Sequence, residues 1–201
     1  MLPLIILGGA VLLFAKYLTG SISSIDKKEI YISVLGPISS GKTVLHNFFR
    51  NTNYKNATIA HNNLDEVILK KGTQAITLKK GRDISGSEQA VSAYYKEEIT
   101  KSDVSFFLFN SSEIIKDEAY SKNVNGRLNF INKYIKTSKK QNIKIILIAS
   151  HFDKVKNNPS AKEIIWNKIS KIASEGKINK PIYINLTNNQ ELEKLKNELF
   201  K

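Results

Sequence analysis

Residues 36–43 read Gly-Pro-Ile-Ser-Ser-Gly-Lys-Thr, which matches the spacing G-x-x-x-x-G-K-T of a phosphate-binding loop. The apolar run 30–35 predicts a buried strand before the loop, and residues 44–49 predict the start of a helix after it, as this motif requires. Backbone amides and the helix N-terminus favour phosphate, Lys42 can reach the β and γ phosphates, and the Thr43 hydroxyl can bind Mg²⁺. The alternative, a glycine turn followed by a surface lysine, does not account for the flanking elements. The predicted cofactor-binding residues of the loop are Gly36, Ser39, Ser40, Gly41, Lys42 and Thr43.

A second polar segment, Asp83-Ile84-Ser85-Gly86, follows the predicted strand 73–79. Asp83 could hold Mg²⁺ through a water molecule, and the Gly86 N–H could meet the γ-phosphate of a nucleotide. The spacing D-x-x-G is common in turns, so its value comes from its position after the third predicted strand. We therefore expect Asp83 and Gly86 to join the phosphate loop in one site.

A third candidate lies at the end of the apolar strand 143–149, which leads into Ser150-His151-Phe152-Asp153. The Asp153 carboxylate could accept hydrogen bonds from N1–H and the 2-amino group of guanine, a pair of donors that adenine lacks. A helix cap or a solvated loop acid is the alternative for Asp153. His151 is predicted to stack or pack, and not to act in catalysis.

The segments that must position these residues alternate between strand and helix patterns. Apolar residues at helical spacing predict helices, and nearly continuous apolar runs predict strands covered on both faces. The Lys71-Gly72 pair between two strand candidates predicts a hairpin. The fold class is therefore predicted as α/β, with a doubly wound, mainly parallel sheet and one antiparallel edge strand. The predicted elements are strands 30–35, 64–70, 73–79, 104–109, 143–149 and 182–185, a helix over 88–101, and helices around Leu128, Ile165 and Leu195.

The chain begins with an uncharged apolar run over residues 2–15, which Lys16 interrupts. Eighteen helical residues would span about 27 Å, just enough for the hydrocarbon core of a bilayer. We predict a single transmembrane anchor helix over 1–19 and a linker over 20–29, with a buried helix or a cleaved signal peptide as the alternatives. Because the positive residues follow the run, the N-terminus would face out, and a G domain over 30–201 would be cytoplasmic.

The composition narrows the classes of partner. The chain has 201 residues and a net charge of +13, which could indicate an affinity for nucleic acid or anionic lipid. Only Arg50, Arg82 and Arg127 are arginines, and the lysines fall in scattered pairs, which argues against specific nucleic-acid binding. The lack of cysteine excludes disulfides and cysteine-based metal sites.

The order of these motifs, from the first predicted strand to the C-terminus, resembles the P-loop GTPases of the Ras/Arf-like group. The first motif of that family matches at residues 36–43, and the third matches at residues 83–86. The fourth motif, usually N/T-K-x-D, matches only at Asp153, with Ser150 and His151 in place of the usual pair. The resemblance implies that these three residues contact the guanine base.

Two weaker matches complete the resemblance. The fifth motif, usually S-A-K, would fall at residues 185–187, which makes Leu186 a predicted nucleotide contact. The second motif is a single threonine, for which Thr58 is the best candidate and Thr52 the alternative. The resemblance thus implies a metal site of Thr43, Thr58 and Asp83, and a catalytic pair of Lys42 and Thr58.

The resemblance implies GTP and GDP as ligands, Mg²⁺ as the metal, and hydrolysis of GTP to GDP and phosphate. Ser87 stands where the family usually has a water-orienting glutamine, and Ile38 stands where many members have glycine, so we expect slow or partner-dependent hydrolysis. A protein effector or activating factor is then implied.

The anchor followed by a G domain resembles the arrangement of signal recognition particle receptor beta subunits. A P-loop ATPase or kinase, and a nucleotide-binding scaffold without efficient hydrolysis, are the alternatives.

Overall fold

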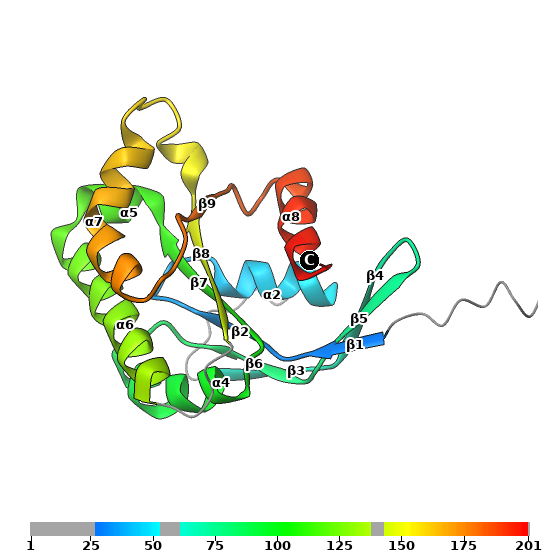
Figure 1. Ribbon diagram of the computed structural model, residues 1–201. Coiled ribbons are helices and arrows are strands. Elements are labelled where there is room, and N and C mark those ends of the chain that lie inside the picture. The colour runs from blue at the N-terminus through cyan, green and yellow to red at the C-terminus, as the bar shows by residue number, and fades with distance from the viewer. Residues whose placement is uncertain (1–26, 53–60, 138–142, 201) are drawn as a thin grey trace, which may run out of the picture.

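Strands in three hydrogen-bonded groups run through the middle of the molecule (Figure 1). The structure is a computed structural model that describes residues 27–52, 61–137 and 143–200. The largest of the described sheets is all parallel, with the strand order β2-β7-β8-β9. A second sheet has the order β1-β5-β4, and the third pairs β3 with β6. The strands are β1 (Lys27–Ile30), β2 (Ile32–Leu35), β3 (His61–Leu64), β4 (Val67–Lys71), β5 (Gln74–Leu78), β6 (Gly81–Ile84), β7 (Val104–Asn110), β8 (Lys144–Ser150) and β9 (Ile182–Tyr183).

Helices cover both faces of the strands, as expected for an α/β protein. Figure 1 shows α5, α6 and α7 on one side of β7 and β8, and α2 and α8 on the other side. The helical segments are α2 (Lys42–Arg50), α3 (Glu88–Ala90), the π-helical η1 (Val91–Tyr95), α4 (Lys96–Lys101), α5 (Ser111–Lys116), α6 (Glu118–Thr137), the 3₁₀-helical η2 (Phe152–Lys154), α7 (Ala161–Glu175), α8 (Asn189–Lys196) and the 3₁₀-helical η3 (Asn197–Phe200).

The side chains of strand β7 are divided between these two layers. Phe106 and Leu108 pack in the layer of α2 and α8, whereas Phe107 and Phe109 pack in the layer of α5, α6 and α7. All four side chains are fully buried. Successive side chains of a strand point to opposite faces, so the continuous apolar run follows from the presence of helices on both sides.

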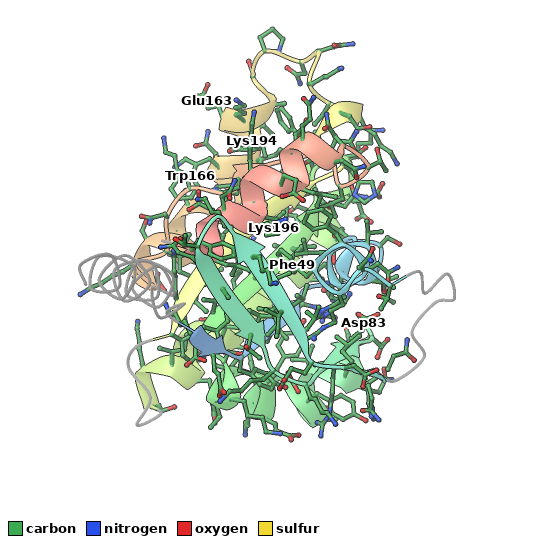
Figure 2. All side chains as sticks on the ribbon, turned by 90° about the vertical axis from the view of Figure 1, so that its right-hand side faces the viewer. Phe49, Asp83, Glu163, Trp166, Lys194 and Lys196 are labelled. Atoms are coloured by element: carbon green, nitrogen blue, oxygen red, sulfur yellow. The ribbon has the colours of Figure 1, made fainter. Side chains whose placement is uncertain are left out.

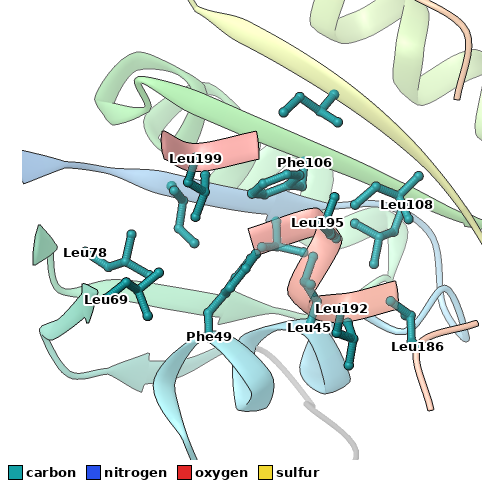
Figure 3. Packing of buried hydrophobic residues seen from close by; sticks show 14 of the residues in the cluster. Leu45, Phe49, Leu69, Leu78, Phe106, Leu108, Leu186, Leu192, Leu195 and Leu199 are labelled. Atoms are coloured by element: carbon teal, nitrogen blue, oxygen red, sulfur yellow. The ribbon is translucent and has the colours of Figure 1, made fainter. Parts of the chain in front are cut away.

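The core on the α2 side is built around Phe49 (Figure 3). The centroid of its ring lies 5.6 Å from that of Phe106 on the central strand β7. Helix α8 adds Leu192 and Leu195 to this core, and η3 adds Leu199. This packing holds α2 against the strands. It thereby fixes the position of the loop that connects β2 to α2.

Breaks in the strands beside β2 divide what the sequence predicts as one sheet. The breaks fall at Tyr31, at residues 65–66 and at residues 79–80, and the pairing registers place them side by side. The Arg50 guanidinium donates hydrogen bonds to the carbonyls of Asp65 and Lys79, the second at 3.0 Å. At the break, these two carbonyls thus accept hydrogen bonds from the Arg50 side chain. The predicted single doubly wound sheet with one antiparallel edge strand is corrected to three sheets, in which both β4–β5 and β3–β6 are antiparallel.

The predicted membrane anchor is also corrected. The 20-residue α6 is the longest helix in the described part of the chain, but it carries charged residues such as Lys122 and Arg127 and buries only one side. Among the described residues, no helix is both long enough and apolar enough to cross a bilayer. The segment 1–19 itself lies outside these residues. Within the described residues, the structure thus does not bear out the predicted transmembrane helix or the predicted single-pass topology with the N-terminus outside.

The neighbouring residues Leu69 and Ile68 test whether the β1-β5-β4 sheet belongs to the core on the α2 side. Leu69 is 9% exposed and packs in that core, whereas Ile68 on the other face of β4 is 51% exposed. We expect Leu69→Ala to lower the free energy of unfolding by about 2–3 kcal/mol, because it leaves a cavity. We expect Ile68→Ala to lower it by less than about 1 kcal/mol. Urea denaturation measures both values, and equal losses would contradict the packing described.

Candidate functional site

The loop between β2 and α2 has an unusual backbone. Gly36, Ser39 and Gly41 have positive φ angles of 145°, 60° and 91°. A side chain at position 36 would collide with the carbonyl oxygen of Leu108, and one at position 41 would collide with the Leu186 side chain. Glycine is thus required at position 36 by a backbone neighbour as well as by its φ angle, and at position 41 chiefly by its φ angle.

The first turn of α2 leaves its amides without a side-chain cap, because the N-cap residue is Gly41. The four residues of this turn include no acid, so no carboxylate of the helix itself competes for its positive end. Uncapped amides at a helix N-terminus bind phosphate well. The predicted loop residues therefore lie in the local structure that their role requires.

Lys42 is only 7% exposed and donates a hydrogen bond from Nζ to the carbonyl of Pro37 at 2.9 Å. Burial lowers the pKa of Lys42 to about 8, while the Asp83 carboxylate acts in the opposite direction. A positive charge that is held inside the loop and only weakly solvated is well suited to bind an anion.

Thr43 and Asp83 come from separate segments and meet at the same place. The Thr43 hydroxyl donates a hydrogen bond to the Asp83 carboxylate, with an Oγ1–Oδ2 distance of 2.7 Å. Asp83 lies on β6 beside helix α2 (Figure 2) and is 2% exposed. The hydroxyl and the carboxylate are both suitable ligands for Mg²⁺.

A metal ion at this position would need ligands beyond the protein. No group of three or more His, Asp or Glu side chains in the described parts of the chain could hold a metal. Mg²⁺ is commonly bound by one or two protein groups together with phosphate oxygens and water. The pair formed by Thr43 and Asp83 fits this mode of binding, and a bound phosphate would complete it.

Gly86 closes the other side of the loop. A side chain at position 86 would collide with the backbone of Pro37 and Ile38, so Gly86 lies directly against the loop. A cavity of about 390 Å³ is lined here by residues 38–44 and by residues 84–86. The two sequence motifs, which are about forty residues apart, thus form the walls of one cavity.

Two residues that the sequence did not single out connect these walls. The Tyr95 hydroxyl accepts a hydrogen bond from the Gly36 N–H at 2.9 Å and donates one to the Gly36 carbonyl at 3.3 Å. Arg127 donates to the Tyr95 hydroxyl at 2.9 Å and to the Gly86 carbonyl at 2.8 Å. Burial raises the pKa of Tyr95, so this hydroxyl stays protonated. Tyr95 ends a π-helical turn, a feature that often occurs at functional sites.

A signal for Arg127 was present in the sequence. It lies three residues after Val124 and next to Leu128, on the apolar side of its helix, where a charged residue is out of pattern. It is also one of only three arginines in a chain with 31 Lys and Arg residues. The same scarcity applies to Arg50, which bonds two backbone carbonyls. Tyr95 gave no comparable signal, because its spacing fits an ordinary helix core.

Ser150 supports the loop from strand β8. Its hydroxyl oxygen lies 2.8 Å from the Ser40 carbonyl oxygen, 3.0 Å from that of Phe109 and 2.9 Å from His151 Nδ1. His151 adopts a left-handed backbone conformation, with φ of 54°, and burial lowers its pKa. His151 also lines a second cavity of about 730 Å³, together with loop residues Pro37 and Ser39. Both residues are thus placed beside the loop.

The remaining predicted residues are less closely joined to the loop. Leu186 is buried and lies against Gly41. Asp153 follows β8 on η2, is exposed, and lines neither of the two cavities beside the loop. Thr52 is exposed beyond the end of α2, where its hydroxyl lies 3.0 Å from Asn47 Oδ1. Thr58 lies outside the described residues, so its predicted role in metal binding and catalysis stays a prediction.

Comparison with known proteins assigns no family to this geometry. No protein-family model matches the chain, and no curated protein shows significant sequence similarity to it. The likeness to Ras/Arf-like GTPases therefore stays a prediction, and any functional assignment must come from the site itself.

Proposed function

We propose that this protein binds a guanine nucleotide with Mg²⁺ at residues 36–43 and acts as a slow or partner-dependent GTPase switch. The observation that carries the proposal is the 2.7 Å contact between Thr43 and Asp83, which joins two motifs that were each predicted to hold Mg²⁺. Lys42 inside the loop and Gly86 against its backbone support the same function.

Each residue of the site has a specific role in this proposal. Lys42 and the loop amides bind the β and γ phosphates, while Thr43 and Asp83 hold Mg²⁺. The Gly86 N–H senses the γ-phosphate, and Thr58 is proposed as a second sensor. A segment that is ordered only by the triphosphate would let a partner distinguish the two nucleotide states.

The choice of guanine depends on Asp153, at the carboxyl end of β8. Its carboxylate is exposed, so it can accept hydrogen bonds from a base above the strand ends without first breaking a buried contact. The Phe152 N–H donates to the Ile184 carbonyl at 3.3 Å, which joins this segment to the one that contains Leu186. The contact between these two strand ends supports the proposal that the base binds there.

The surroundings of Ser87 favour slow hydrolysis. Its hydroxyl accepts a hydrogen bond from the Ala90 N–H at 3.4 Å as the N-cap of α3. A side chain engaged as a cap does not orient an attacking water in the way that a glutamine does. This same observation supports the second candidate function, a nucleotide-binding scaffold without efficient hydrolysis.

The primary test is nucleotide binding by the full chain after bound nucleotide has been removed. We expect Mg²⁺-dependent binding of GTP and GDP, and weaker binding of ATP, by titration calorimetry. Lys42→Ala should weaken binding by about 10- to 150-fold, because a hydrogen bond to a charged group contributes about 1.5–3 kcal/mol. Lys70→Ala is the matched control, since Lys70 is exposed on β4. A wild-type chain that binds no nucleotide would refute the proposal.

Base recognition is tested by Asp153→Asn. An amide in place of the carboxylate can pair with the 2-oxo group of xanthine, so we expect preference to shift from guanine toward xanthine nucleotides by at least about tenfold. Competition between GTP and XTP measures the shift. Asp65→Asn, at an exposed acid between β3 and β4, should leave the preference unchanged. Unaltered preference in the Asp153 variant would remove this residue from the base site.

Single-turnover hydrolysis distinguishes a switch from a scaffold. Without a partner, we expect GTP loss by the wild-type chain at a rate on the order of 10⁻³ s⁻¹ or slower, because Ser87, and not a glutamine, directly follows Gly86. Release of radioactive phosphate measures this rate. Turnover of several molecules per second without a partner is incompatible with slow hydrolysis, and no detectable turnover over a day would favour the scaffold.

A further inference from the structure

Arg127 joins three separate parts of the molecule through one buried side chain. Its Nη2 donates to the Gly86 carbonyl at 2.8 Å, its Nη1 donates to the Tyr95 hydroxyl at 2.9 Å, and its Nε donates to Asn123 Oδ1 at 2.6 Å. The residue is only 4% exposed. Through Tyr95, which bonds both backbone groups of Gly36, the guanidinium is connected to the start of the phosphate loop.

These contacts fix both walls of the 390 Å³ cavity relative to each other. Gly86 is pressed on one side against the backbone of Pro37 and Ile38, and its carbonyl is held on another side by Arg127. Hydrogen bonds that are buried and made to a charged group are among the stronger ones in proteins. Arg127 and the backbone of Pro37 and Ile38 therefore hold Gly86 in position from two sides.

Only a planar group with several donors can make this connection. The guanidinium presents fixed, diverging N–H groups, and it lies 5.7 Å from the centroid of the Tyr95 ring. A lysine ammonium is a compact point charge, so it cannot hold the same acceptors in one plane. In a chain so rich in lysine, arginine at this position indicates a specific geometric requirement.

We propose that Arg127 is a positioning residue that holds Gly86 at the γ-phosphate position and thereby sets the preference of the site for triphosphate over diphosphate. The proposal rests on the proposed nucleotide-binding function. The β-phosphate, which both nucleotides carry, binds to the loop and to Lys42, so it does not need Gly86. The γ-phosphate does need Gly86, so a loosened Gly86 weakens triphosphate binding selectively.

The test compares affinities of the full chain for GDP and for a non-hydrolysable GTP analogue, both with Mg²⁺. Arg127→Lys should weaken binding of the analogue about tenfold and that of GDP less than about twofold, because one buried charge-assisted bond is lost on the γ-phosphate side only. Tyr95→Phe removes the hydroxyl that accepts from Arg127 Nη1, so the guanidinium that holds the Gly86 carbonyl is less firmly oriented, and we expect about a threefold selective loss. This second variant tests the proposal even where Arg127→Lys does not fold.

Arg50→Lys is the matched control, because Arg50 is also a buried arginine that bonds backbone carbonyls, but away from the cavity. It should lower the urea midpoint without changing the ratio of the two affinities. Equal losses for both nucleotides, or an unchanged ratio, in the Arg127 and Tyr95 variants would overturn the positioning role. A wild-type chain that binds neither nucleotide would instead refute the proposed function, and the positioning role with it.

Discussion

The conformation of the loop 36–43 depends on groups from outside the loop that bond to its backbone or press against it. Gly36 and Gly41 adopt their positive φ angles readily, but the positive φ of Ser39 is costly, and such a conformation persists only where its surroundings determine it. Tyr95 bonds Gly36, the Ser150 hydroxyl lies against the Ser40 carbonyl, and Leu186 lies against Gly41. The site therefore requires η1 and the ends of β8 and β9 to converge on one short segment.

The parallel sheet provides this convergence. In the order β2-β7-β8-β9 the carboxyl ends of all four strands lie along one edge, so the residues that follow them meet there. The sheet lies between two apolar layers, which share the alternating side chains of β7. Since α2 is anchored by Phe49 to the same strand, loop and strand ends are fixed against one common core.

Much of this arrangement could be predicted from local patterns. The motif 36–43 and the central strands have strong signals, because turn chemistry and buried apolar runs act over a few residues. The short α5 was missed, since its start depends on a cap by Asn110, whose Oδ1 accepts from the Ser112 and Glu113 amides. Strands β3 and β6 were missed because they are short and polar, and are specified only by pairing with each other. Contacts between distant segments, such as that of Arg127 with Gly86, leave no periodic pattern in the sequence and so could not be predicted from it.

The two halves of the proposed nucleotide site differ in how firmly they are built. On the phosphate side, Lys42 and Asp83 are buried and bonded, and Gly86 is held by Arg127. On the base side, the proposed contact is with Asp153, which is exposed, so that water competes with the base for its carboxylate. Buried charge-assisted bonds contribute more than exposed ones, so most of the binding energy would come from the phosphates and Mg²⁺. A site built in this way responds more to the number of phosphates than to the identity of the base, which is what a molecular switch requires.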